Sequence, residues 1–286
     1  MTTSPPVGLI GLGLLGSAIS ERLLGARFAV LGFDIDVERR EALALLGGRV
    51  ANDAADVARQ SQRVILSLPT SVIAATVVDE IAAQLAPGAI VIDTTTGEPA
   101  EMARIGEQLE SRGVRYLDAT VAGSSEQARH GEVLVLVGGE SKTVAACQDL
   151  FDAFARRTIH VGPCGSGARM KLVVNLVLGL NRAVLAEGLS FARACGIDPR
   201  AALDVLRDSP AYSTVMDTKG EKMLTGDFTP EARLRQHLKD VRLILAAAAE
   251  HGAKTPLSAW HAAALQALVD QGFGDDDNAS VIRAFE

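Results

Sequence analysis

The sequence predicts an α/β fold in two parts: an N-terminal doubly wound parallel sheet, then an all-α C-terminal domain with a long interdomain helix. Two observations predict it. Up to about residue 161, short apolar runs alternate regularly with helical patterns, which is typical of βαβ units. Beyond that point only helical patterns remain. We therefore expect one domain at residues 1–163 and a second at residues 164–286.

The first domain is predicted to contain six strands and five helices. The strands are short apolar runs: Val7–Ile10, Phe28–Phe33, Arg63–Leu68, Ala89–Asp93, Arg115–Ala119 and Val133–Val137. The helices lie between them: Leu15–Leu24, Glu38–Leu46, Ser71–Leu85, Pro99–Arg112 and Thr143–Phe154. This regular alternation is the basis for the parallel sheet.

The second domain is predicted to be helical throughout. Its first helix, Ala168–Cys195, follows a glycine-rich break and is followed by four more: Pro199–Arg207, Ala211–Leu224, Pro230–His251 and Ser258–Gln271. Polar residues interrupt the apolar stretch 172–189, which favours a buried helix over a membrane span. Residues 274–278 are interpreted as a solvated turn before a last short helix.

Composition narrows the function. The net charge of -7 argues against a nucleic-acid or anionic-membrane binder, although a local basic pocket for an anionic substrate remains possible. Cys147, Cys164 and Cys195 lie far apart and are odd in number, which indicates reduced thiols in a cytoplasmic protein. Residues 1–6 carry no positive side chain before the first apolar run, so we expect no secretory signal.

A glycine-rich motif follows the first strand and opens a helix, and it reads Gly11, Leu12, Gly13, Leu14, Leu15, Gly16. In this context the motif predicts a Rossmann dinucleotide site. Gly11 permits a tight turn, Gly13 lets the backbone approach the pyrophosphate, and Gly16 lets the helix pack on the sheet. The helix N-terminus would bind the phosphates. The alternative is a tight turn that binds no nucleotide.

Asp34 ends the second predicted strand, eighteen positions after Gly16. A carboxylate there accepts hydrogen bonds from the adenosine ribose and repels a 2′-phosphate, and Asp36 adds to the repulsion. The sequence therefore favours NAD, with NADP the less favoured cofactor. In the alternative, Asp34 is a solvated turn residue and Arg39 or Arg40 binds the 2′-phosphate.

With these motifs, nearly the whole chain resembles the β-hydroxyacid dehydrogenases, the family of 3-hydroxyisobutyrate dehydrogenase and 6-phosphogluconate dehydrogenase. Four further landmarks carry the resemblance: Leu66–Pro69, Asp93–Thr96, Asp118–Ser124, and the segment Gly165–Asn175, which is similar to the family's Gly-x-Gly-x-x-x-Lys-x-x-Asn-Asn helix. The resemblance implies that Leu68, Pro69 and Thr96 lie beside the cofactor and that Ala122, Gly123 and Ser124 grip the substrate carboxylate.

The chain departs from the family pattern at four positions. Ala122 stands where relatives usually have Ser, Ser124 replaces the second Gly, and Thr120 replaces Pro. Val174 replaces the first Asn of the catalytic pair. These changes affect which acid is expected as the substrate, but they do not remove the reactive group, the amine of Lys171.

Lys171 is the predicted catalytic acid/base. Lys171 and Asn175 are four residues apart, so on a helix their side chains share a face. Desolvation at a domain junction would lower the pKa of a lysine into the range useful for proton transfer. Asn175 would fix the reacting oxygen or a carboxylate. The alternatives are a lysine that extends to solvent and an asparagine that only packs. We expect no metal, because His130 and His160 have no ligand spacing.

The resemblance also implies that Lys239, in the pair Lys239-Asp240, helps to hold the substrate carboxylate or the nicotinamide. The alternative is an ordinary exposed charge. Arg235 and His237 are interpreted as part of a solvated helix face; the alternative is that they bind an extra anionic group of the substrate.

The sequence therefore predicts an NAD-dependent dehydrogenase acting on a small β-hydroxyacid of the 3-hydroxyisobutyrate or glycerate type. An imine-reductase-like enzyme and a catalytically silent dinucleotide-binding module are the alternatives, and Lys171 argues against both. The long helix is apolar around its circumference, which predicts a homodimer or homotetramer.

Overall fold

The computed structural model describes residues 5–286; the expectation about a secretory signal concerns residues that lie partly outside this range. The chain forms two compact units, one up to Lys171 and the other Leu172–Glu286. The boundary near residue 163 stays a prediction.

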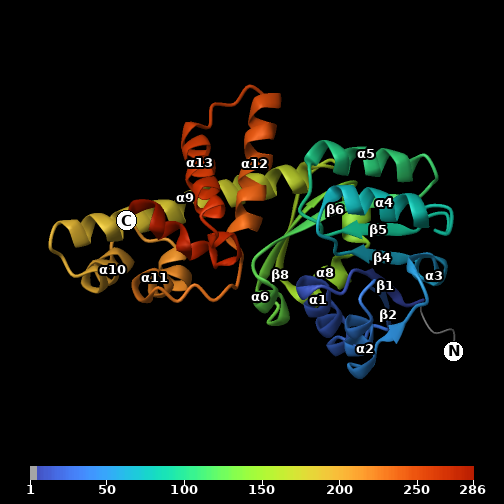
Figure 1. Ribbon diagram of the computed structural model, residues 1–286. Coiled ribbons are helices and arrows are strands. Elements are labelled where there is room, and N and C mark those ends of the chain that lie inside the picture. Colours follow the sequence, from blue (N-terminus) through green and yellow to red (C-terminus); the bar gives the residue numbers. More distant parts are fainter. Residues whose placement is uncertain (1–4) are drawn as a thin grey trace. The chain divides into compact units, whose positions relative to one another are not determined.

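The first unit is built on an eight-stranded sheet with the strand order β3-β2-β1-β4-β5-β6-β7-β8 (Figure 1). The strands are β1 (Val7–Ile10), β2 (Val30–Phe33), β3 (Arg49–Val50), β4 (Arg63–Leu66), β5 (Ile90–Asp93), β6 (Arg115–Ala122), β7 (Val133–Gly138) and β8 (Ala155–Gly162). The first six strands are parallel and have the Rossmann order. Successive strands are added on one side of β1 up to β3 and on its other side from β4 onward, so the topological switch point lies between β1 and β4. The predicted doubly wound architecture is confirmed.

Two details of the sheet differ from the prediction. β7 is antiparallel to β6, so the sheet is only mostly parallel. β3 and β8 were not expected as strands. β3 has two residues, and β8 is an edge strand in which Arg156 and Arg157 are exposed, so neither shows the apolar run of a central strand.

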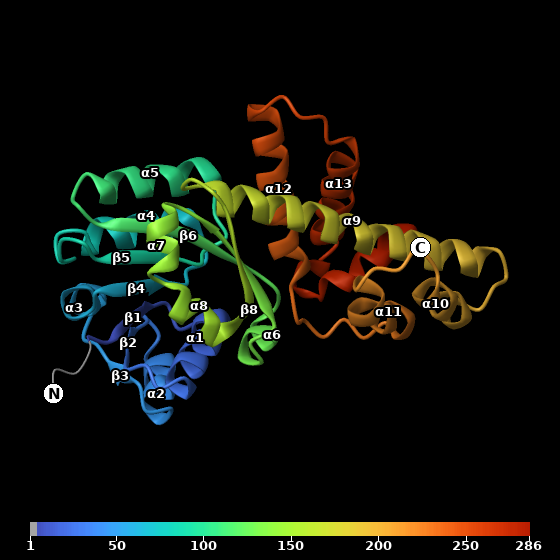
Figure 2. The same ribbon diagram turned by 180° about the vertical axis from the view of Figure 1, so that it is seen from behind.

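Helices cover both faces of the sheet. One face packs against α1 (Leu14–Gly25), α2 (Val37–Leu45), α6 (Ser125–Arg129), α7 (Ser141–Ala145) and α8 (Gln148–Phe154). The other packs against α3 (Ala54–Gln60), α4 (Ser71–Ile81) and α5 (Pro99–Glu110). Figure 2 shows α7 and α8 from behind. With two covered faces, the strands are buried on both sides, which explains their continuous apolar runs.

Helix α9 (Ser166–Ala194) starts in the first unit and continues into the second. Among the described residues it is the one helix that is long and apolar enough to cross a membrane by length and composition. Its most apolar 18-residue stretch is 44% buried inside the protein. Buried positions such as Leu185 and Leu189 recur every three or four residues, as expected for a helix with one face in a core.

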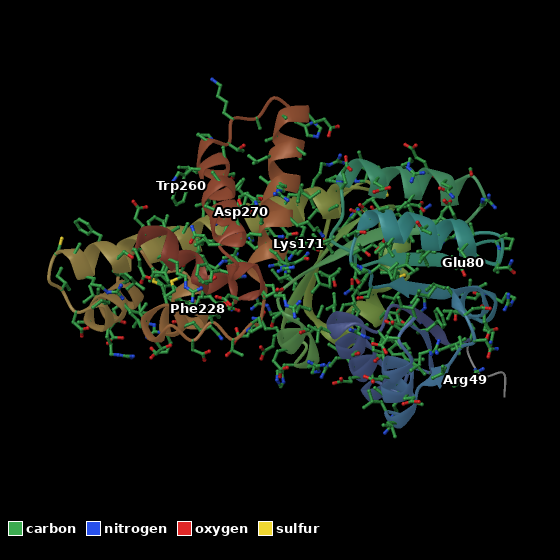
Figure 3. All side chains as sticks on the ribbon, in the orientation of Figure 1. Arg49, Glu80, Lys171, Phe228, Trp260 and Asp270 are labelled. Atoms are coloured by element: carbon green, nitrogen blue, oxygen red, sulfur yellow. The ribbon has the colours of Figure 1, made fainter. Side chains whose placement is uncertain are left out.

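The second unit is helical, as predicted. It contains most of α9 with α10 (Pro199–Asp208), α11 (Val215–Thr225), α12 (Leu234–Glu250), α13 (Pro256–Asp270) and the 3-10 helices η1 (Phe273–Asp275) and η2 (Asn278–Phe285). Asp198 caps α10 by accepting hydrogen bonds from the next two free backbone N–H groups. Trp260, labelled in Figure 3, lies on α13 with its ring centroid 5.5 Å from that of Phe285.

Two polar segments are buried against expectation. Residues 274–278 were expected to be solvated, but Asp277 is 0% exposed. Its carboxylate accepts hydrogen bonds from Lys219 Nζ at 3.0 Å and from the backbone N–H of Glu231 at 2.9 Å, which explains why a charge is tolerated there. His237 is also buried, with its ring 5.1 Å from that of His261, because Gly179 of α9 leaves room for it. Arg235 is exposed and pairs with Asp275.

Candidate functional site

The glycine loop lies at the carboxyl end of β1, beside the point where strand order reverses. Gly11 has φ +91°, which a residue with a side chain rarely adopts. A Cβ on Gly11 would overlap the carbonyl oxygen of Ser67, and one on Gly16 would overlap that of Gly11. The first and third glycines are therefore required by the packing of α1 against the strands.

Gly13 has a different environment. A Cβ there would meet only the end of the flexible Arg39 side chain, at 3.1 Å. Gly13 also lines an open cavity of about 320 Å³ with Leu12, Asp36, Arg39 and Arg129. Space beside the second glycine is what a pyrophosphate needs, and the open N-terminus of α1 begins at Leu14. The loop therefore fits a dinucleotide.

The three leucines of the motif occupy different surroundings. Leu12 is buried, Leu15 packs partly against the core, and Leu14 is 70% exposed. The side chains of Leu12 and Leu15 are thus used in the core, whereas the Leu14 side chain is accessible.

Asp34 lies next to the glycine loop and is half-buried. Its Oδ2 accepts the Leu12 N–H at 2.6 Å and its Oδ1 accepts the Asp36 N–H at 2.9 Å. Each carboxylate oxygen can accept a further hydrogen bond, as a ribose requires. The carboxylate is thus held by the loop that would contact the phosphates.

The two nearby arginines are held by other groups. Arg39 forms an ion pair with Asp36 at 3.2 Å and donates to the carbonyl oxygen of Leu12. Arg40 donates to the Asp34 carbonyl oxygen, and its guanidinium lies over the Phe33 ring at 5.5 Å. Both guanidinium groups are therefore engaged with protein groups beside Asp34.

The loops after β4 and β5 are joined to each other. Leu68 donates its N–H to Thr95 Oγ1 at 3.3 Å, and the Thr94 hydroxyl donates to the Leu66 carbonyl oxygen at 2.8 Å. Leu68 and Thr96 are half-buried and Pro69 is exposed. The expected cofactor residues Leu68, Pro69 and Thr96 thus lie at the same edge of the sheet as the glycine loop.

Two buried carboxyl groups lie below these loops, at paired positions of β5 and β6. Asp93 accepts the Thr95 N–H at 2.9 Å and the Tyr116 hydroxyl at 2.9 Å. Burial raises the pKa of Asp93 to about 6, and the nearby charge of Asp118 adds to the rise. Burial also raises the pKa of Asp118, while hydrogen bonds from the backbone N–H groups of Ala168 and Gly165 oppose the rise.

The expected substrate loop, Ala122–Ser124, leads from β6 into α6. Gly123 has φ +150°, and a Cβ there would press on Val133. Ser124 caps α6: its Oγ accepts the Gln127 N–H at 3.1 Å, and Gln127 Oε1 accepts the Ser124 N–H at 2.9 Å. This capping box uses one lone pair of the Ser124 hydroxyl and leaves its proton able to be donated.

Lys171 and Asn175 lie one turn apart on α9, so their side chains leave the same side of the helix. Lys171, labelled in Figure 3, is half-buried and belongs to the first unit. Asn175 is buried in the second unit, where its Nδ2 donates to Asp240 Oδ2 at 3.1 Å. Lys239, the neighbour of Asp240 on α12, is half-buried.

Reasoning from the sequence missed three polar residues that hold these groups. Asp240 orients Asn175, while Asp118 and Thr120 contact the first turn of α9. The Lys-Asp pair and the Asp-Ala-Thr motif were visible in the sequence, but their partners lie 65, 47 and 47 residues away. No pattern in the local sequence signals such contacts.

Comparison with known proteins agrees with this arrangement. Residues 6–162 match the family described as the NAD binding domain of 6-phosphogluconate dehydrogenase. Residues 165–285 match the family described as NAD-binding of NADP-dependent 3-hydroxyisobutyrate dehydrogenase.

Individual relatives cover the full chain. A 2-(hydroxymethyl)glutarate dehydrogenase of Eubacterium barkeri is 28% identical over 290 residues, which is 100% of this chain and 96% of that protein. The cytokine-like nuclear factor N-PAC of Xenopus tropicalis is 27% identical across 99% of this chain, but only 54% of that protein is matched.

A solved structure is similar over the same length. The structure of Mycobacterium tuberculosis 3-hydroxyisobutyrate dehydrogenase with L-serine has a TM-score of 0.92 at 25% identity, covering 99% of this chain and 100% of that one. With both family matches and a fold shared from end to end, the chain belongs to the 3-hydroxyisobutyrate-dehydrogenase-like β-hydroxyacid dehydrogenases, a family of NAD(P)-dependent oxidoreductases.

Proposed function

We propose that this protein is an NAD-dependent dehydrogenase that interconverts a small β-hydroxyacid, of the 3-hydroxyisobutyrate or glycerate type, and its semialdehyde. The observation that carries the proposal is the coexistence of two features in the first unit: a glycine loop with Asp34 beside it, and Lys171 near the start of α9. A binding module needs only the first feature, whereas a dehydrogenase also needs an acid/base.

Each proposed residue has one task. Lys171 takes the hydroxyl proton on its Nζ during oxidation and returns it during reduction. Asn175, fixed by Asp240, donates its amide to the substrate, and Lys239 pairs with the substrate carboxylate. In the first unit, the backbone at Ala122–Ser124 is proposed to contact the substrate, as the family resemblance implies. The chemistry that NAD supplies when bound is the acceptance of a hydride from the hydroxyl-bearing carbon.

Replacing Lys171 tests the activity. We expect reduced cofactor to form with at least one member of a panel of three- to five-carbon β-hydroxyacids. Lys171→Ala should lower turnover by at least about 100-fold, because a positioned acid/base contributes roughly 10²–10⁴-fold, while NAD affinity stays the same. Lys142→Ala, on the separate helix α7, is the matched control. Turnover unchanged in Lys171→Ala would refute the assigned role.

The cofactor site is tested at Gly13. Gly13→Ala should fold normally, since its Cβ meets only a flexible side-chain end, yet it should weaken NAD binding by filling the phosphate approach. Calorimetric titration with NAD, with Gly25→Ala on the same helix as control, measures this. Nothing lies within 4 Å of a Cβ at Gly25. Equal NAD affinity in both variants would contradict a nucleotide at this loop.

We propose NAD over NADP because of Asp34. Its carboxylate accepts the Leu12 N–H of the glycine loop and would repel a 2′-phosphate bound beside that loop, and Asp36 contributes a second negative charge. Asp34→Ser should therefore lower the catalytic efficiency with NAD and raise it with NADP. If the wild-type protein already uses NADP more efficiently than NAD, the assignment is wrong.

The two alternatives make different predictions. A catalytically silent module, suggested by the match to N-PAC, binds NAD but reduces none with any acid in the panel. An imine reductase consumes reduced cofactor with cyclic imines and does not depend on Lys171. Assaying both substrate classes with wild type and Lys171→Ala separates the three functions.

We also propose that the protein is a homodimer or homotetramer. The support is an exposed apolar stripe on the part of α9 that belongs to the second unit: Val173 (55% exposed), Val177 (51%), Val184 (66%) and Phe191 (69%). Their spacing of four, seven and seven residues puts them on one helix side. Val184→Glu should lower the mass measured by light scattering, whereas Val205→Glu on α10 should not. A wild-type monomer at micromolar concentration would refute an oligomer.

The proposed location is the cytoplasm, with α9 as a core helix and no membrane or nucleic-acid partner. In support, α9 carries the buried polar residues Asn175 and Arg182, and such residues are rare in membrane-spanning segments. Cell fractionation should recover the protein with soluble enzymes. Recovery in a membrane pellet that resists high salt would contradict this location.

A further inference from the structure

The first turn of α9 is held by a side chain of β6. Asp118 is 0% exposed; its Oδ1 accepts the Gly165 N–H at 2.9 Å and its Oδ2 accepts the Ala168 N–H at 2.8 Å. The first N–H groups of a helix have no partner within the helix, and a residue just before the helix usually supplies one. Here the cap comes from a strand 47 residues earlier in the chain.

A second residue of β6 contacts the same turn. The Thr120 hydroxyl is 0% exposed and donates to the Gly167 carbonyl oxygen at 3.1 Å. In α-helical geometry this carbonyl is the acceptor for the N–H of the residue four positions later, which is Lys171. The Thr120 hydroxyl and the Lys171 N–H therefore share the Gly167 carbonyl oxygen as their hydrogen-bond acceptor.

Glycines allow this turn to approach the sheet closely. A Cβ on Gly167 would lie 2.6 Å from the Leu136 carbonyl oxygen and would overlap the backbone of Asp118. A Cβ on Gly138 would lie 2.9 Å from the Gly167 nitrogen. The first turn of α9 thus packs directly against the backbone of β6 and β7, with no side chain between them. The hydrogen bonds from Asp118 and Thr120 therefore fix its position directly.

We propose that Asp118 and Thr120 are positioning residues for Lys171: they fix the start of α9, and so the place of the amine one turn later. This inference rests on the proposed function of Lys171. A displacement of about 1 Å at a reacting group can lower the rate roughly 100-fold. Loss of the hydrogen bond from either Asp118 or Thr120 should therefore lower turnover. Neither side chain contacts the glycine loop through a described hydrogen bond, so cofactor affinity is unaffected.

The experiment compares Thr120→Val, Thr120→Ser and Thr143→Val. Thr120→Val keeps the shape but removes the hydroxyl; we expect kcat to fall by about 10-fold to 100-fold, with the KM for NAD within about twofold. Thr120→Ser restores the hydroxyl and should recover most of kcat. Thr143→Val, which removes another buried hydroxyl of the same unit, bonded to Glu140, should leave kcat unchanged.

A double variant separates positioning from simple stabilisation. If Thr120 acts through Lys171, the residual turnover of Lys171→Ala should not fall further when Thr120→Val is added. An additional loss of the same size in that background would overturn the proposal, as would an unchanged kcat in Thr120→Val alone. If Lys171→Ala itself keeps full turnover, the proposed function fails instead, and the two failures are thus distinguishable.

Asp118→Asn provides a second measurement. The amide offers one acceptor where two N–H groups need one each, so we expect a larger fall in kcat together with a lower melting temperature. Should this variant fail to fold, the Thr120 series still decides. A folded Asp118→Asn protein with wild-type kcat would refute the role of Asp118.

Discussion

Replacing Asp93 by Asn should change how the stability of the protein depends on pH. Asp93 is 0% exposed, accepts hydrogen bonds from Thr95 and Tyr116, and is paired across the sheet with Asp118. Burial raises the pKa of Asp93 from 3.8 to about 6. An asparagine side chain at this position would keep the contacts, because its oxygen can accept from Thr95 and its amide can donate to the Tyr116 oxygen.

The sign and size of the effect follow from this shift. Well below pH 3.8 the group is protonated in both states and does not affect the free energy of unfolding. Between 3.8 and about 6, the unfolded chain loses its proton while the folded protein keeps it, so the free energy of unfolding falls as pH rises. The whole shift corresponds to about 3 kcal/mol, at about 1.4 kcal/mol per unit. The Asp93→Asn variant has no carboxyl group at this position, so its free energy of unfolding should not show this decrease.

Urea denaturation followed by circular dichroism measures the difference. Relative to wild type, Asp93→Asn should gain about 2 kcal/mol in free energy of unfolding between about pH 4 and about pH 7. Tyr116→Phe is the companion variant: it removes a donor that lowers the pKa of Asp93, so it should steepen the wild-type trend. Parallel curves for wild type and Asp93→Asn would show that Asp93 titrates normally and would refute the reasoning.

Three further predictions concern packing and buried charge. Gly16→Ala should prevent folding of the first unit while Gly25→Ala does not, which expression and melting curves test; a normal melt for Gly16→Ala would show that α1 can shift. Lys219→Met should lower the free energy of unfolding by about 3 kcal/mol, because it removes the cation that is hydrogen-bonded to the fully buried Asp277; a change below about 1 kcal/mol in urea melts would contradict this. Burial lowers the pKa of His261 from 6.5 to about 4, so the unfolded chain binds a proton that the folded protein resists and stability falls as pH drops through this range. His261→Gln should flatten that fall in acid melts, and an unchanged slope would refute it.

Much of the fold could be predicted because it depends on local pattern. Central strands such as β1 and β5 are continuous apolar runs between helices, and this alternation predicts a parallel doubly wound sheet. The antiparallel β7 could not be predicted in this way. Its direction depends on the short connection through helix α6, which follows the predicted substrate loop and was not expected as a helix.

The candidate site could likewise be predicted where it depends on a sequence motif, but not where it depends on contacts between distant residues. The glycine loop and Asp34 are close in sequence, and the structure brings them into hydrogen-bond contact. The contact of Asn175 with Asp240 joins residues 65 positions apart, so only tertiary packing creates it. Burial of Asp277 and His237 was missed for a related reason: polar residues are mostly exposed, and these two depend on partners or space supplied by distant helices.

The position of Trp260 has a spectroscopic consequence. It is the single tryptophan of the sequence, and it lies in the second unit beside Phe285 and the ring of His261. Its emission therefore reports on that unit alone, whereas far-ultraviolet ellipticity sums the helices and strands of both. When the two signals change at the same denaturant concentration, the halves of the chain melt as one cooperative body; separate midpoints would reveal autonomous domains.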